Sequence, residues 1–274
     1  ASTVNLENCV SGEAFSILGQ AYGIKIDNCD SIRLKSCVFN NNASGGSRAA
    51  GVSIVNSNNI LFIDSLSANN TCTVIDPTTR TCGFAIEDSS AIFLHDCTSS
   101  SNFGYGPVYG FYIDGSSYCR IDETESLANL STGSSCAGFY SNNGTNNLIK
   151  TCDAMSNNGA LNGYGVLLTG TERGSGVGEC SIEADIGLTG TAFGVFMGPS
   201  TTVSGAMGCR VLGHQGGVAG FGLYDSAGES STNSFFANVA MKNSTNYRLP
   251  SSAMAELFSG PLSTVPGTFQ NVSL

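Results

Sequence analysis

The chain has few of the residues on which many active sites and nucleic-acid surfaces depend. Its 274 residues include no Trp, two His, and eleven Lys or Arg against twenty-one Asp or Glu, for a formal net charge of −10. So few cations exclude an extended nucleic-acid or basic membrane-binding surface. No apolar run approaches the roughly 18 residues of a transmembrane helix, so we expect no membrane insertion. His95 and His214 share no repeat position, and no Ser-His-Asp arrangement is indicated.

Glycine is abundant and recurs at a nearly fixed spacing. Eight glycines stand 27 to 32 residues apart, and each is followed by an apolar residue: Gly23, Gly51, Gly83, Gly110, Gly138, Gly165, Gly194 and Gly222. A fixed period indicates structural units that bury their apolar faces only by stacking on one another. The sequence therefore predicts a solenoid.

Each repeat begins with residues that alternate with period two. Positions −1, +1 and +3 relative to the glycine are mostly apolar or aromatic, as in Tyr109, Phe111 and Ile113. We expect these positions to share the inward face of a strand, with the glycine and position +2 outward. Runs of Ser, Asn, Asp and Gly separate the strands, as is typical of turns.

A unit of about 28 residues with two or three short strands predicts one rung of a parallel β-helix. The spacing of the glycines resembles that of the pectin-lyase-like superfamily, which includes polysaccharide lyases, polygalacturonases and viral tailspikes. The resemblance covers roughly residues 1–243, and it is greatest to members of the tailspike and fibre type. It implies an all-β, right-handed parallel β-helix of about eight rungs with a short irregular C-terminal cap.

The two ends of the chain differ from its repeats. Val4, Leu6 and Cys9 match positions 28 residues later that follow the first strand of a rung, so we expect residues 1–243 to start inside a rung of a longer protein. The repeat stops near residue 243, and residues 244–274 carry three prolines. We expect this segment to cap the open end of the helix.

Eight of the eleven cysteines fall into two groups. Six of them share one repeat position and predict a column of small buried thiols: Cys9, Cys37, Cys97, Cys152, Cys180 and Cys209. Cys72 and Cys82 bracket an insertion in the second repeat, and we predict a disulfide between them in an oxidising compartment. No pair has the spacing of a zinc site, so we expect neither a structural metal nor a cofactor.

Position +2 of the repeat carries large side chains in the last five rungs: Tyr112, Tyr140, Leu167, Phe196 and Tyr224. An outward apolar strip of this kind marks an interface or a ligand groove. Three interpretations are open: cover by the chain's own tail, packing into a homotrimer, or stacking of sugar rings. Trimeric β-helices that bind glycans between chains combine the last two.

A row of acids offers the best catalytic candidate. Asp64, Asp96 and Glu123 occupy position 13 on three consecutive rungs, and His95 and Asp122 precede two of them. Carboxylates about 5 Å apart are within the range of a retaining glycosidase, and they also attract a cation such as calcium. The alternative is a solvated turn whose acids keep the solenoid soluble.

We favour a non-catalytic or weakly catalytic surface protein, an adhesin or a component of a virion fibre, that is trimeric and binds glycans. The rival is a polysaccharide lyase or glycoside hydrolase acting through the acidic row. The scarcity of charge and the abundance of Ser, Thr, Asn and Gly indicate an extracellular or virion-surface location.

Overall fold

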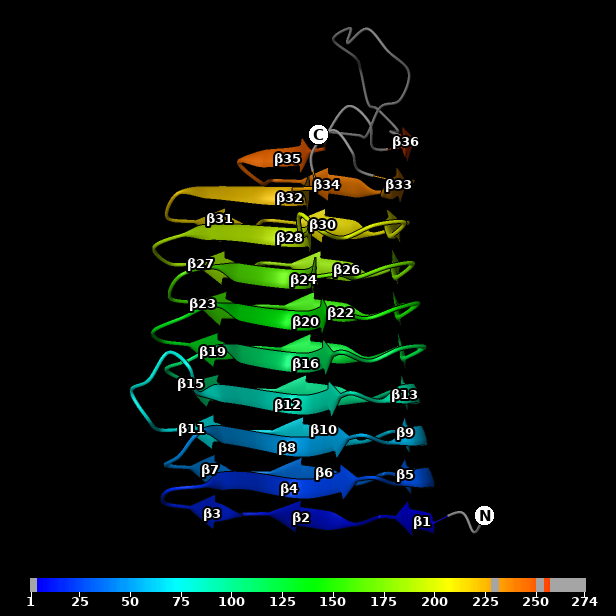
Figure 1. The fold of residues 1–274 in the computed structure, drawn as a ribbon. Helices are drawn as coiled ribbons and strands as arrows, with labels where there is room; N and C mark the ends of the chain where they lie inside the picture. Colours follow the sequence, from blue (N-terminus) through cyan, green and yellow to red (C-terminus); the bar gives the residue numbers. More distant parts are fainter. Residues whose placement is uncertain (1–3, 228–231, 250–253, 257–274) are drawn as a thin grey trace, which may run out of the picture.

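The computed structural model describes residues 4–227, 232–249 and 254–256, and within them the chain forms one continuous stack of parallel strands (Figure 1). Each turn of the chain contributes strands to four sheets, A to D. No helix occurs among the described residues, and so none is available there to cross a lipid bilayer.

Sheets A and B form two adjacent walls of the stack. Sheet A consists of β1 (Val4–Glu7), β5 (Asp30–Lys35), β9 (Asn58–Ile63), β13 (Ser90–His95), β17 (Arg120–Asp122), β21 (Leu148–Lys150), β25 (Gly176–Gly178), β29 (Gly205–Met207), β33 (Ser234–Phe236) and β36 (Met254–Glu256). Sheet B consists of β2 (Val10–Gly12), β6 (Val38–Asn40), β10 (Leu66–Ala68), β14 (Thr98–Ser100), β18 (Glu125–Leu127), β22 (Asp153–Met155), β26 (Ser181–Glu183), β30 (Arg210–Leu212) and β34 (Val239–Met241).

Sheets C and D complete the circuit. Sheet C consists of β3 (Phe15–Ser16), β7 (Ala43–Ser44), β11 (Thr71–Cys72), β15 (Phe103–Gly104), β19 (Leu130–Ser131), β23 (Asn158–Gly159), β27 (Ile186–Gly187) and β31 (Gln215–Gly216). Sheet D consists of β4 (Gln20–Asp27), β8 (Arg48–Val55), β12 (Arg80–Glu87), β16 (Val108–Asp114), β20 (Cys136–Asn142), β24 (Gly163–Thr169), β28 (Thr191–Met197), β32 (Ala219–Asp225) and β35 (Thr245–Arg248).

Strand pairing confirms the predicted solenoid and sets its length at about nine turns instead of eight. Equivalent residues pair from turn to turn, as in Phe84 with Phe111 and Phe111 with Phe139. The expected boundary at residue 243 falls just before β35, and β35 and β36 still add to sheets D and A. The rest of the predicted cap lies outside the described residues.

The core is a column of side chains that repeats with the turns. Position +1 of sheet D points inward, as predicted, and Phe84, Phe111 and Phe139 stack there with ring centroids 5.0 Å apart. Position +3 is also buried, for example Ile86 and Ile113. These residues share one interior with the inward residues of sheets A and B.

The prediction that the repeated glycine faces outward is wrong. A methyl group on Gly83 would lie 1.9 Å from Ser99 Oγ of sheet B, and one on Gly110 would lie 2.0 Å from Ser126 Oγ. The glycines therefore face inward, and they let sheet D approach sheet B closely. Because the glycine and position +1 both face inward, the alternation breaks there and position −1 turns outward. Our assignment of Tyr109 to the inward face was wrong for that reason.

Polar side chains bond from turn to turn at the corner between sheets B and C. Buried amides form a ladder in which each Nδ2 donates to the Oδ1 of the turn above at 2.7 to 2.8 Å: Asn42, Asn70, Asn102, Asn129 and Asn157. The next positions hold Asp185, which accepts from Asn157 Nδ2 at 3.1 Å, and His214. The ladder satisfies amide groups that would be costly to bury alone.

The cysteine column lies at the corner between sheets A and B, as predicted, and most of its thiols are buried. The structure differs from the predicted disulfide, because Cys72 and Cys82 are both free. Cys72 donates to the carbonyl of Gly46, whereas Cys82 occupies the outward position −1 and packs with Ala50 and Tyr112. The two thiols lie on different faces of the wall.

Candidate functional site

The outer surface of sheet D carries two columns of large side chains, where the sequence had indicated one. Positions −1 and +2 both point outward, and together they form what we call the aromatic face: Tyr109, Tyr112, Tyr140, Tyr164, Leu167, Phe193, Phe196, Phe221 and Tyr224. Neighbouring rings stack, as in Tyr112 on Tyr140 at 5.1 Å and Phe196 on Tyr224 at 5.2 Å. Most of these side chains are half-buried.

Below the aromatic face, two turns carry small residues at the same outward positions. Ala50 and Ser53 of β8 and Cys82 and Ala85 of β12 are fully buried there, and the larger side chains of Tyr22 and Tyr109 pack against this group. An open pocket of about 360 Å³ lies there, and its lining comes from sheet D and the loops before it: Gln20, Ser47, Arg48, Thr78, Arg80, Pro107, Tyr109, Tyr112 and Tyr140. The loop between β11 and β12 projects at this level and supplies Thr78 (Figure 1).

Two arginines and one glutamate organise this pocket. Arg48 and Arg80 occupy matching positions on the neighbouring strands β8 and β12. The carboxylate of Glu87 accepts hydrogen bonds from both guanidinium groups, and its Oε1 lies 2.8 Å from Arg80 Nη2. The guanidinium of Arg80 lies 4.0 Å from the ring centroid of Tyr112, a cation–π contact. Three arginine nitrogens buried from solvent, Nε and Nη2 of Arg48 and Nε of Arg80, have no hydrogen-bond partner.

The tyrosines of the pocket remain neutral hydrogen-bonding groups. Burial raises the pKa of Tyr140 to about 12, and it raises the pKa values of Tyr109 and Tyr112 further above their usual range. Tyr112 donates to Asp114 Oδ2 at 2.8 Å, which fixes its ring. At physiological pH the pocket therefore offers guanidinium groups, neutral phenols and aromatic ring faces.

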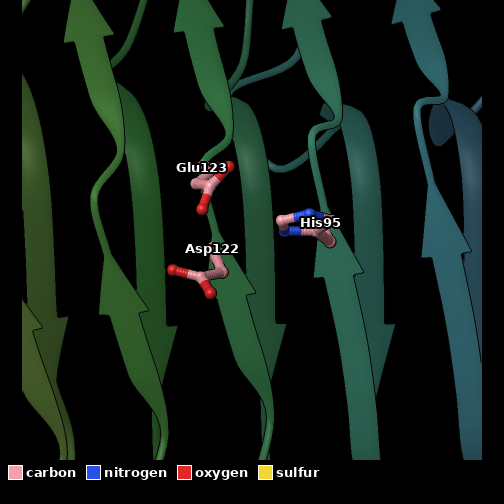
Figure 2. Close-up of side chains that lie close together, drawn as sticks. All are labelled: His95, Asp122 and Glu123. Carbon is pink, nitrogen blue, oxygen red and sulfur yellow. The ribbon is translucent and has the colours of Figure 1, made fainter.

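A second group of chemical side chains lies on sheet A, where Figure 2 shows His95 of β13 pointing toward Asp122 and Glu123 of the next turn. One ligand atom from each of the three lies within 4.8 Å of the others. Asp122 is nearly buried and accepts from Arg120 Nη2 at 2.6 Å, and the His95 ring stacks on Phe93. The Nδ1 atom of His95 is buried without a partner.

The structure brings together only part of the predicted acidic row. His95, Asp122 and Glu123 meet, whereas Asp64 and Asp96 are exposed at the corner and lie outside this cluster. Asp64, Asp96 and Glu123 have positive φ values of 51° to 53°, a conformation that Asp adopts more readily than most residues. One imidazole and two carboxylates suit a transition metal better than calcium, which prefers oxygen ligands alone.

Sequence reasoning missed the residues that shape the pocket. Arg48, Arg80 and Glu87 received no role, although the two arginines share repeat position −3 and this alignment could have pointed to them. The aromatic residues at position −1 were visible in the sequence but were assigned to the interior. The predicted strip residues Tyr112, Tyr140, Leu167, Phe196 and Tyr224 all lie on the outer face, as expected.

Comparison with known proteins identifies the fold. The family model described as the right handed beta helix region matches residues 2–185. No curated protein sequence matches the chain.

Two solved structures are similar at low sequence identity. The crystal structure of the periplasmic alginate epimerase AlgG is 16% identical, with 91% of this chain and 73% of that chain covered and a TM-score of 0.44. The receptor-binding domain of the siphovirus 9NA tailspike is 10% identical, with 91% and 54% covered and a TM-score of 0.27. The chain thus spans about half of that tailspike domain.

Proposed function

Because the chain belongs to the family of right-handed β-helix proteins, we propose that it acts through an outer face of the helix, and that it binds glycans on the aromatic face. The observation that carries the proposal is the set of stacked rings beside an open pocket lined by Arg48, Arg80, Tyr109, Tyr112 and Tyr140. Ring faces pack against the apolar faces of sugars, while a few polar groups fix orientation.

A substitution at Tyr140 tests this proposal. Tyr140→Ala removes one half-buried ring from the pocket wall, and we expect it to weaken binding of a responsive oligosaccharide about three- to tenfold by calorimetry. Tyr118→Ala is the matched control, since Tyr118 is 64% exposed and lies away from sheet D. If no member of a broad oligosaccharide panel binds, or if both variants lose affinity equally, the proposal fails.

The proposal includes a place for the protein outside the cell, as an adhesive surface component or part of a virion. Its composition, poor in charge and rich in Ser, Thr, Asn and Gly, supports that location. Packing of three copies along the aromatic face, in a homotrimer, remains a prediction. Light scattering after size-exclusion chromatography tests it directly, because a monomeric mass would contradict it.

The cluster of His95, Asp122 and Glu123 favours a second candidate function, cleavage of a polysaccharide. An imidazole with two carboxylates within 4.8 Å can divide the roles of general acid and general base. We expect His95→Gln and Asp122→Asn each to abolish release of new chain ends from a responsive polysaccharide. Asp64→Asn is the control, since Asp64 lies outside the cluster. Failure of the unaltered protein to release chain ends would remove this candidate.

A further inference from the structure

We infer that the pocket on sheet D selects glycans that carry an anionic substituent, a carboxylate or a sulfate ester, and that Arg48 and Arg80 recognise it. This inference rests on the proposed glycan-binding function and names the class of glycan. Three observations support it: the placement of the two cations, the unpartnered donors beside them, and the single carboxylate that bridges them.

The placement of the arginines is unusual for this chain. The protein carries a net charge of −10 and only eleven Lys or Arg residues. Two of these are paired on neighbouring strands and line one pocket. Arg48 is only 7% exposed, so its charge is held in a largely desolvated setting. A buried guanidinium is costly unless an anion and hydrogen-bond acceptors accompany it.

The hydrogen bonds of the two guanidinium groups are incomplete. Glu87 accepts from Nη1 of Arg48 and from Nη2 of Arg80. Nε and Nη2 of Arg48 and Nε of Arg80 remain without partners. Two positive charges therefore face one bridging negative charge, and donors are left over. A small rotation of either guanidinium would present these donors to an oxyanion, which the forked geometry of arginine suits.

The other charged groups near the pocket do not compete for the arginines. Asp76, in the overhanging loop, accepts from the backbone N–H and Oγ1 of Thr78, and these bonds lower the pKa of its carboxyl group. Asp114 accepts from Tyr112 and from Asn142 Nδ2 at 2.7 Å. Glu87 is thus the internal carboxylate that an anionic ligand would partly displace.

Calorimetry with matched oligosaccharides tests the inference. The probes are an oligogalacturonate, a sulfated galactan oligosaccharide and a neutral galactan oligosaccharide of the same length. We expect at least one anionic probe to bind about tenfold or more tightly than the neutral one, and the preference to shrink at high salt. The comparison of the two anionic probes identifies the carboxylate or the sulfate as the preferred group.

Substitutions assign the preference to the arginines. Arg80→Gln is expected to remove most of the preference while binding of the neutral probe changes less than about twofold. Arg48→Lys tests the more buried position while keeping the charge, and Glu87→Gln is expected to raise affinity for the anionic probe. Arg210→Gln is the control, because Arg210 is exposed on sheet B and pairs with Glu183.

The outcomes separate this inference from the proposed function. Equal binding of neutral and anionic probes, with Tyr140→Ala still weakening both, would overturn the anionic preference and leave glycan binding intact. A preference unaffected by Arg80→Gln would also overturn the inference. If none of the probes binds and a broad panel is also negative, the proposed function itself fails.

Discussion

The lower and upper turns of the stack share one backbone frame but fill its outer surface differently. In the lower turns, β8 and β12 place Ala50, Ser53, Cys82 and Ala85 outward, and larger neighbouring side chains cover them completely. In the upper turns, β24, β28 and β32 place large rings at the same positions, and the surface is filled. In the lower turns the pocket is thus lined by arginines and tyrosines around small, covered residues, whereas in the upper turns the outward residues themselves form the surface.

The interior shows a second difference between the same two regions. The ladder between sheets B and C consists of neutral amides in the lower turns, whereas Asp185 and His214 take the equivalent positions in two upper turns before Asn243. His214 Nδ1 lies 3.5 Å from Asp185 Oδ2, and both side chains are fully buried. Burial raises the pKa of Asp185 well above its usual range and lowers the pKa of His214 to about 4. The upper turns therefore carry titratable groups where the lower turns carry none.

The largest loss of stability is expected from substitutions at the inward glycine of sheet D, which the lower and upper turns share. Gly83→Ala in the lower turns would place a methyl group 2.7 Å from the carbonyl oxygen of Gly110, and Gly165→Ala in the upper turns would place one 2.8 Å from that of Gly194. We expect each to lower the free energy of unfolding by roughly 3 kcal/mol in urea denaturation. A large loss in one variant and none in the other would show that the frame is not shared.

The titratable pair should give the upper turns a dependence on pH. His214, with its pKa lowered to about 4, stays neutral while the unfolded chain takes up a proton below about 6.5. His214 therefore does not reduce the free energy of unfolding above pH 6.5. As pH falls toward 4, the protonation of this group in the unfolded chain lowers the free energy of unfolding by about 3 kcal/mol. His214→Gln should remove this contribution, so between pH 6.5 and 4 the variant should lose less stability than the unaltered protein, as measured by denaturation of both at several pH values.

The raised pKa of Asp185 acts in the opposite direction. The unfolded carboxyl group ionises above about pH 3.9 while the buried one stays protonated, so this group makes the protein less stable as pH rises. Asp185→Asn continues the amide ladder and should remove the decline in stability that sets in as pH rises above about 3.9. A decline of equal slope in the variant would contradict this assignment.

A smaller effect is expected when the lower turns are made to resemble the upper ones. Ala85→Tyr would force a large ring into a covered position beside Tyr112, its partner on the next strand, and displace the pocket residues packed there, so we expect about a tenfold loss of glycan affinity in calorimetry. Phe196→Ala makes the reverse change, because it opens the upper surface far from Arg48 and Arg80. It should leave affinity within about twofold. An equal loss of affinity in both variants would show that binding does not depend on the pocket of the lower turns.

The sequence predicted the repeat and the inward column well because period and polarity are local signals. The eight glycines gave the turn length, and Phe84, Phe111 and Phe139 took the predicted places. The glycine direction could not be predicted from alternation, since two adjacent residues face inward at the bend. That single break moved Tyr109 and Phe193 from the predicted core to the surface.

The candidate site was only partly accessible to sequence reasoning. Tyr112 and Tyr140 were found because they share a repeat position, whereas the small, covered residues Ala50 and Ala85 gave no such signal. The contact of Arg48 and Arg80 with Glu87 joins different repeat positions, and no period connects them. The sequence correctly placed His95 and Asp122 on neighbouring turns. It could not show that Asp64 and Asp96 are exposed, because that depends on the direction of each side chain at the corner after sheet A.

The in-register stacking also has a mechanical consequence. The hydrogen bonds between strands run along the axis of the stack, as does the amide ladder from Asn42 to Asn157. Tension between the two ends would load successive turns in series, so the chain would open at its weakest turn. A pull on the side of the stack, across the axis, would instead load the bonds of one strand together. A protein that holds its ligand on sheet D would therefore resist force best when it is anchored so that the load crosses the axis.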